Sequence, residues 1–266
     1  MNFATEVRLA WIFRVAVGME FVGHGAFGVI TKKAWVPYFG IFGIPEPWAW
    51  KLMPLVGALD ILLGLSVLVR PCRAVLLYMA VWGFVTALLR PLSGEPVWEA
   101  VERAGNYGVP LAFFLLTQAR GWFSQTELRP LDQPLRERLG FLLRATTGAL
   151  LIGHGLLAAA VQKVVFTHHL QALGLPAVPV PALGGFEIAL GLAVCLAPVA
   201  PLLLFVFAWK VVTELLYPLS AAPFWEVIER GGSYAAPLAL FFLLARPHLA
   251  TPDDAHFDGP VKVPAR

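Results

Sequence analysis

The stretch WEAVERAGNYGVPLAFFLL at residues 98–116 is matched by WEVIERGGSYAAPLALFFLL at residues 225–244. The two stretches begin 127 residues apart, since 225 − 98 = 127, and the same offset pairs Asp60 with Glu187. Self-similarity at a fixed offset is the sequence signature of a duplicated structural unit. We therefore expect two similar halves, each ending in the same motif.

The match continues toward the amino terminus with a slightly different offset. GHG at residues 23–25 answers GHG at residues 153–155, and Arg14 answers Arg144, both pairs being 130 residues apart. The slip of three residues fits a loop of different length between the first and second helix of each half. The duplication therefore covers most of the chain.

The composition indicates a chain whose surface does not face water. Of the 266 residues, 58% are hydrophobic and 14% are charged, and the mean hydropathy is +0.72. A soluble domain keeps roughly a quarter of its residues charged. Much of the outer surface must therefore face lipid, and we expect the lipid bilayer to be the main partner.

The charged residues exclude some classes of protein. The net charge is +3, but Lys and Arg stand at the ends of apolar runs and form no basic stripe interleaved with aromatic residues, so we expect no nucleic-acid partner. Cys72 and Cys195 lack metal-ligand spacing, so neither a disulfide framework nor a metal site is expected. The chain has no P-loop, dinucleotide fingerprint, serine elbow or H-E-x-x-H motif. Whether it is an enzyme stays open, and any activity would borrow a cofactor or a partner.

Apolar runs of about 20 residues cross a bilayer as helices. On that criterion we expect spans near residues 8–31, 50–70, 72–90, 104–120, 140–164, 181–198, 200–217 and 233–246. The first of these lacks a small-residue cleavage site and is interpreted as a retained helix. The sequence thus predicts an all-α, polytopic membrane bundle of eight transmembrane helices.

The predicted organisation has four parts. We expect a first four-helix repeat at residues 1–120, a polar cytoplasmic connector at 121–137, a second four-helix repeat at 138–246, and a polar tail at 247–266. Four spans per repeat is an even number, so both repeats enter the membrane from the same side and are parallel.

Loop charges predict the orientation. On the amino-terminal side lie Arg8, Arg70, Arg73, Arg120, Arg129, Arg136, Arg138 and Arg246. On the opposite side lie Lys32, Lys33, Lys51, Arg90, Lys163 and Arg230. Because positive charge gathers in cytoplasmic loops, we expect both termini in the cytoplasm.

An acid stands in the middle of the second expected helix of each half. Asp60 and Glu187 are each flanked by glycines three residues before and four residues after, on the same helix face. Small residues let a second helix approach closely, so each acid should meet protein rather than lipid. One interpretation is a protonated or hydrogen-bonded packing element. The other is a proton carrier or an acid that orients a cofactor, because burial raises a carboxyl pKa.

Two histidines are matched in the same way. His24 and His154 lie between glycines in the first helix of each half, and Glu20 precedes His24 by four residues, where the second half has Leu150. A matched pair could ligate one haem or contact a quinone. A lone intramembrane histidine is more often a hydrogen-bonded helix contact. No C-x-x-C-H motif is present, which argues against haem and leaves the cofactor unknown.

The third set of polar residues precedes the last helix of each half. It comprises Glu99, Glu102 and Arg103, and their counterparts Glu226, Glu229 and Arg230. Glutamate and arginine four residues apart can form an ion pair within a helix. The set is either a solvated interfacial cap or a partner of His24 and His154 across the bundle.

The halves also differ at two positions. Lys210 and Glu214 stand deep in the third helix of the second half, where the offset of 127 places Gly83 and Ala87 in the first. The pair either neutralises itself or places Lys210 opposite Glu20, the unmatched acid of the first half.

These motifs resemble the DoxX-like membrane family, duplicated in tandem. The pattern of that family resembles an Arg-containing first helix that ends in H-G-x-x-K, followed by a second helix with L-V-G-x-x-E-x-x-x-G. Arg14 and His24–Gly25 match the first element. The stretch LVGALDILLGLSVLVRP at 55–71 matches the second, with Asp60 as the acid. In the second half, Arg144, His154–Gly155 and GGFEIALGLAVCL at 184–196 provide the match. The family's lysine would fall at Gly28 and Ala158, and Lys32, Lys33 or Lys163 stands about a turn later.

The resemblance implies a multi-pass protein of a bacterial or archaeal inner membrane. Some members resemble subunits of thiosulfate–quinone oxidoreductase, which makes a quinone site and a redox partner subunit the first functional hypothesis. The alternative is a non-enzymatic carrier, pore or scaffold with a cavity between the repeats.

Overall fold

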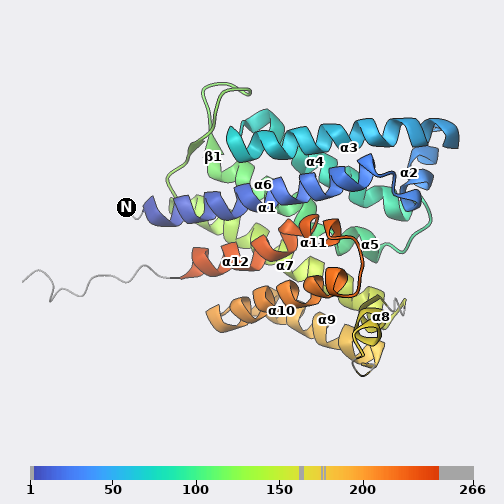
Figure 1. Ribbon diagram of the computed structural model, residues 1–266. Coiled ribbons are helices and arrows are strands. Elements are labelled where there is room, and N and C mark those ends of the chain that lie inside the picture. The colour runs from blue at the N-terminus through green and yellow to red at the C-terminus, as the bar shows by residue number, and fades with distance from the viewer. Residues whose placement is uncertain (1–2, 162–164, 175, 177, 246–266) are drawn as a thin grey trace, which may run out of the picture.

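The computed structural model describes residues 3–161, 165–174, 176 and 178–245. The described chain is helical except for one short hairpin (Figure 1). We call residues 3–116 the first half and residues 133–245 the second half. Lys163, Arg246 and the expected tail at 247–266 lie outside the described residues.

Each half has a similar order of helices. The first contains α1 (Phe3–Val29), a 3-10 turn η1 (Lys33–Trp35), α2 (Val36–Ile41), α3 (Glu46–Val69), α4 (Arg73–Leu92), α5 (Trp98–Val101) and α6 (Ala104–Leu116). The second contains α7 (Gln133–Ala159), α8 (Val165–Ala172), α9 (Val180–Leu196), α10 (Ala200–Leu219), α11 (Trp225–Ile228) and α12 (Gly231–Leu244).

The expected spans all fall on helices, but their lengths differ. Within the described residues, six helical segments are long and apolar enough to cross a membrane: Thr5–Val29, Glu46–Val69, Arg73–Leu92, Gln133–Ala159, Ala200–Leu219 and Trp225–Leu244. The helix expected at 181–198 has 17 residues, and α6, expected at 104–120, has 13. At 1.5 Å per residue, 13 residues reach only about 20 Å of a hydrocarbon core of roughly 30 Å. By length and composition, six helical segments rather than eight therefore qualify as candidate spans among the described residues.

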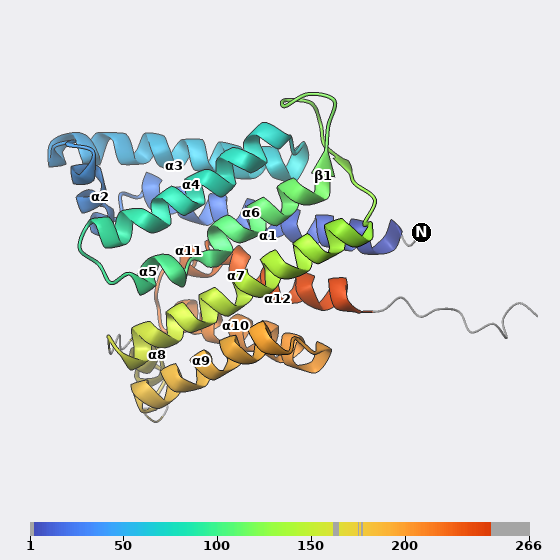
Figure 2. The ribbon, with the colours of Figure 1, turned by 180° about the vertical axis from the view of Figure 1, so that it is seen from behind.

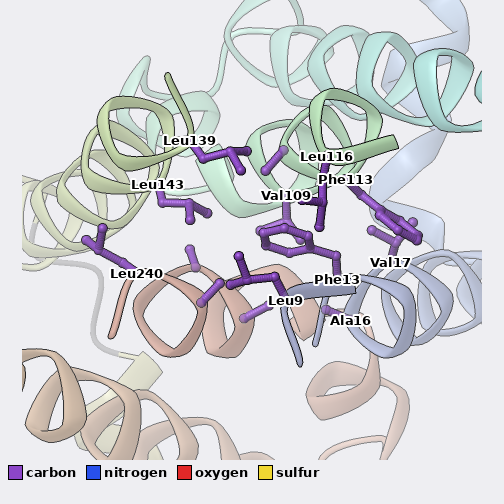
Figure 3. Close-up of a cluster of buried hydrophobic side chains, with 14 of the residues drawn as sticks. Leu9, Phe13, Ala16, Val17, Val109, Phe113, Leu116, Leu139, Leu143 and Leu240 are labelled. Atoms are coloured by element: carbon purple, nitrogen blue, oxygen red, sulfur yellow. The ribbon is translucent and has the colours of Figure 1, made fainter. Parts of the chain in front are cut away.

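Four helices form the centre of the bundle. α1 and α6 come from the first half and α7 and α12 from the second, and Figure 3 shows their apolar side chains meeting. Phe13, Leu9 and Leu143 are fully buried there, with Val109 and Leu240 beside them. α3 packs along α1, α9 along α7, α4 along α6 and α10 along α12. The core thus joins the two halves rather than lying within each.

The outer faces of α3, α4 and α10 are largely apolar. Large exposed hydrophobic side chains of α3, α4 and α10 include Leu55, Leu62, Val81, Phe84, Phe205 and Val212. Several ionisable side chains, by contrast, are buried. A soluble monomer seldom exposes contiguous apolar surface on this scale. The distribution, together with the six long apolar helices, indicates a membrane protein.

The segment between the two halves contains a short hairpin. β1 (Thr117–Gln118) and β2 (Glu127–Leu128) pair as an antiparallel hairpin. The expected connector at 121–137 ends early, because α7 begins at Gln133. Asp132 caps this helix by accepting a hydrogen bond from the Leu135 N–H at 2.9 Å. The first turn of α7 therefore lies within the range expected for the connector.

The hairpin and the amino terminus lie at the opposite end of the molecule from α2 and α8 (Figures 1 and 2). The end of α12 lies on the same side as the start of α1. Both ends of the described chain therefore face one side, which is what the predicted orientation requires.

Glycines set the spacing of the first and second long helices in each half. A Cβ atom added at Gly57 would lie 2.5 Å from the Gly25 carbonyl oxygen, and one added at Gly184 would lie 2.5 Å from the Gly155 carbonyl oxygen. These backbones touch, so no side chain fits between them. The close approach brings α3 against α1 and α9 against α7.

Two adjacent glycines of α9 test this packing. Gly184→Ala should lower the free energy of unfolding by about 1–3 kcal/mol, because its methyl group overlaps the α7 backbone. Gly185→Ala is the matched control, since open space surrounds that position. It should leave stability unchanged or raise it by roughly 0.5–1 kcal/mol through helix propensity. Equal effects of the two substitutions in a detergent unfolding titration would contradict the packing.

Candidate functional site

Two histidine–carboxylate pairs occupy matching positions in the two halves. His24 Nδ1 lies 3.5 Å from Asp60 Oδ2, and His154 Nδ1 lies 2.7 Å from Glu187 Oε2. The first pair joins α1 to α3 and the second joins α7 to α9. Asp60 is 2% exposed and Glu187 is 1% exposed. The structure therefore brings together residues that the sequence offered as separate candidates.

Short helices α5 and α11 carry the expected ion pairs. Arg103 Nη1 lies 2.9 Å from Glu99 Oε2, and Arg230 Nη1 lies 2.7 Å from Glu226 Oε2, each pair four residues apart. The same nitrogens also contact Glu102 and Glu229. Glu99 is buried, so this set is not a simple solvated cap.

The same motif packs against the histidine helix of the other half. A Cβ atom at Gly23 would lie 2.4 Å from the Glu229 backbone nitrogen, and one at Gly153 would lie 2.4 Å from the Glu102 backbone nitrogen. The first glycine of each GHG triplet therefore makes room for the opposite half. Of the two interpretations, this geometry favours the one in which the motif lies beside His24 and His154 across the bundle.

Lys32 adds a charged contact between the halves. Its Nζ lies 3.0 Å from Glu226 Oε1 of α11. The same ammonium group lies 3.8 Å from the centre of the Phe27 ring. Lys33, in contrast, is exposed. Of the lysines that follow His24 and His154, Lys32 is thus the one that contacts the other half, while Lys163 is outside the described residues.

A cavity of about 270 Å³ opens beside His24 and Asp60 in the first half. Most of its wall is apolar and comes from α2, α3 and α4, including Trp35, Phe39, Met53 and Leu89. Trp35 stacks on the His24 ring with 4.5 Å between ring centroids. The polar groups gather on one side of an otherwise apolar space, which is the usual character of a small-molecule pocket.

One donor and one acceptor at this wall lack protein partners. The buried Asp60 Oδ1 and Trp82 Nε1 have no hydrogen-bond partner among the residues the structure describes, and both side chains line the cavity. In the second half, Trp209 Nε1 donates to Glu187 Oε1 at 3.0 Å. Aspartate is one methylene shorter than glutamate. The shorter side chain of Asp60 therefore leaves the Trp82 N–H without the carboxylate partner that Trp209 has.

A hydrogen bond and an ion pair hold α2, which lines the cavity, against the end of α4. The Tyr38 hydroxyl of α2 donates to Glu95, and Arg90 Nη1 lies 3.0 Å from the other oxygen of that carboxylate. Partial burial of Glu95 raises its pKa, but the Tyr38 hydrogen bond and the charge of Arg90 outweigh this and lower the pKa overall. Glu95 therefore stays ionised and holds α2 over the cavity at neutral pH.

The second half has a smaller and more polar cavity, of about 80 Å³. His154, Glu187, Lys210, Glu214, Tyr217 and Arg230 line it. Lys210 Nζ pairs with Glu214 Oε1 at 2.7 Å, and Arg230 Nε lies 2.8 Å from the other oxygen of Glu214. Lys210 therefore forms its ion pair with Glu214 rather than with Glu20.

Glu20 is a further buried acid close to His24. It is 2% exposed and lines a small gap together with His24, Trp82 and Asn106. Its Oε2 has no hydrogen-bond partner within the described part of the chain. The first half thus holds a second buried acid near His24, one turn away on α1.

Sequence reasoning missed the two tryptophans that distinguish the cavities. Trp82 and Trp209 are related by the same offset of 127 as Asp60 and Glu187, so the duplication itself carried the signal. Trp35 and Tyr38 had no matching signal and emerge only because α2 folds over α3 and α4. No cluster of three or more potential metal ligands occurs among the described residues.

No protein-family model, curated protein or solved structure matches this chain. The function must therefore be inferred from the geometry of these pairs and cavities.

The buried Lys210–Glu214 pair can be tested by a double-mutant cycle. Lys210→Met and Glu214→Leu should each lower the free energy of unfolding by about 3–5 kcal/mol, because each leaves a buried charge without this partner. The double variant should lose clearly less than the sum of the two single losses, although Arg230 still loses its contact with Glu214. Unfolding titrations of all four proteins provide the measurement. Additive losses in the double variant would show that the two side chains do not act as a pair.

Proposed function

We propose that this chain is an inner-membrane protein of eight crossings, built from two parallel four-helix repeats and related to the DoxX-like family. Support comes from the matched contacts of α1 with α3 and of α7 with α9, and from the reciprocal packing of each GHG triplet on the other half. The short helix α6 would cross together with α5, which directly precedes it, and α9 would cross as a 17-residue helix.

The proposed orientation places both termini and the hairpin in the cytoplasm. The end of the molecule that carries α2 and α8 would then face the outer side of the membrane. The arginines of the amino-terminal side support this, since they include Arg8, Arg70, Arg73 and Arg129 near the hairpin end.

We further propose that the cavity of the first half binds the head group of a quinone, as part of a quinone-linked redox system. The observation that carries this proposal is the free Trp82 N–H together with the free Asp60 oxygen in an apolar pocket. A quinone carbonyl accepts hydrogen bonds, and a quinol hydroxyl donates them. The two free groups therefore suit both redox states of one ligand.

The remaining wall suits the rest of such a molecule. The aromatic and aliphatic side chains of α2, α3 and α4 would pack against the flat ring, and the stacked Trp35–His24 pair offers one planar surface. The volume of about 270 Å³ is near the lower limit of roughly 300 Å³ for small-molecule pockets. It suits a single ring better than a large ligand.

His24 would then exchange protons with the bound ligand, while Asp60 orients the imidazole ring of His24. A histidine changes charge near neutral pH, and a neighbouring carboxylate fixes its tautomer. Electrons would come from a partner subunit, in keeping with the resemblance to membrane subunits of redox complexes.

A carrier without enzymatic activity is the second candidate. One observation favours it: cavities reach both Asp60 and Glu187, and His24, Arg90, Arg103 and Asn106 line both cavities. A lipid extract and an absorption spectrum of the purified protein separate the two functions. Bound quinone supports the redox function, whereas its absence together with solute flux in proteoliposomes supports the carrier.

The chain offers a matched pair of variants for the quinone site. Asp60→Glu should weaken binding of a decyl-substituted benzoquinone by up to about tenfold, because the longer carboxylate would reach Trp82 as Glu187 reaches Trp209. Trp82→Phe should weaken it similarly by removing the donor. Glu187→Asp, the reverse change in the second half, should leave affinity unchanged. Calorimetry on the protein in nanodiscs measures all three.

Two outcomes would contradict the proposed site. One is wild-type protein that shows no heat of binding with the benzoquinone. The other is binding that Glu187→Asp weakens as much as Asp60→Glu does, since that would move the ligand to the second half or to the lipid-facing surface.

A further inference from the structure

The cavity of the second half is lined by ionisable groups at positions that are small in the first half. Lys210 and Glu214 correspond to Gly83 and Ala87 by the offset of 127. Both are nearly completely buried, at 3% and 4% exposure. Groups of this kind are costly inside a membrane bundle and usually mark ion or proton pathways. The quinone site proposed above makes no use of them.

The size and chemistry of this cavity suit water. A water molecule needs roughly 10–15 Å³ of such space and two to four polar partners. The volume of about 80 Å³ therefore has room for several waters. Its wall carries both signs of charge, from Lys210, Arg230, Glu214 and Glu229 among others, so no single ion is favoured.

One end of the cavity reaches the proposed quinone site. His24 lines both the second-half cavity and the first-half cavity, as do Arg90, Arg103 and Asn106. His24 also contacts Asp60, whose carboxylate faces the first cavity. His154 lines the second cavity with Glu187. Both histidines therefore line the same polar space.

The other end leads toward α8. Tyr217 lines the cavity, and its ring lies 4.5 Å from the ring of His169, centroid to centroid. His169 Nδ1 is hydrogen-bonded to the Ser220 hydroxyl. Its Nε2 is buried without a hydrogen-bond partner in the part of the chain described, and the residue is 7% exposed. The adjacent His168 is exposed.

The surroundings of His169 suit a proton acceptor. Burial lowers its pKa, as do the nearby charges of His168 and Arg230, while Glu226 and Glu214 act in the opposite direction. The ring is therefore neutral at neutral pH. A neutral imidazole accepts a proton on one nitrogen and releases one from the other, as a shuttle requires.

We propose that the second half is a proton path, which connects His24 through the water-sized cavity and Tyr217 to His169 at the α8 end. The proposal rests on the quinone function and deepens it. A quinone reduced in the first cavity takes up two protons with the two electrons donated by its protein partner. The path delivers those protons from the outer side, and returns them when quinol is oxidised.

The test follows proton exchange without any quinone present. The full chain is labelled with ¹⁵N-histidine and placed in nanodiscs, and the His24 ring signal is assigned with His24→Gln. The rate at which the His24 ring proton exchanges with water is then measured by NMR. His169→Phe removes the shuttle group, and Tyr217→Phe removes only a hydroxyl at the cavity wall. His168→Phe is the matched control on the same helix.

His169→Phe and Tyr217→Phe should each slow exchange at His24 by about tenfold, whereas His168→Phe should not change it. Wild-type rates in both of the first two variants would overturn the path. If His169→Phe does not fold, Tyr217→Phe alone decides the result. Failure of benzoquinone binding in calorimetry, with slowed exchange in these variants, would instead remove the quinone function and leave the path intact.

Discussion

The structure depends on keeping ionisable side chains away from hydrocarbon. Asp60, Glu187, Lys210 and Glu214 are buried, while the outer faces of α3, α4 and α10 are apolar. Charged groups at this depth are tolerated only when they face protein or an internal polar space. Each of these side chains has either an oppositely charged neighbour or a cavity beside it. The glycine contacts between the long helices make this burial possible, because the close approach brings Asp60 to His24 and Glu187 to His154.

The two halves pack into one bundle rather than forming two separate bundles. α5 carries Glu102 against Gly153 of α7, and α11 carries Glu229 against Gly23 of α1. The buried apolar cluster likewise draws on α1 and α6 of one half and on α7 and α12 of the other. Neither half would bury its central surface alone, so the duplicated units are expected to fold as one body.

The two cavities differ because matched positions of the two halves carry different residues. Aspartate at position 60, where the second half has Glu187, leaves Trp82 without the partner that Trp209 has. Lys210 and Glu214, where the first half has Gly83 and Ala87, give the second cavity charged walls. One cavity is therefore apolar with two free polar groups, and the other is small and polar. The shared wall at His24 and Arg103 places them next to each other.

The sequence by itself determined the helical class, the apolar outer surface, the matched halves as a prediction, and the acids and histidines as candidates. Composition and spacing carry these features because hydropathy and helical period are local properties. Only the tertiary structure decided that His24 meets Asp60, that Lys210 pairs with Glu214, and that Trp82 stays free beside a cavity. Lys210 and Glu214 share α10, whereas His24 and Asp60 lie on different helices. The distance between His24 and Asp60 depends on how closely the two backbones approach, and the free Trp82 N–H depends on where the Asp60 carboxylate lies. The glycines and the short side chain of Asp60 can be read from the sequence, but these distances cannot.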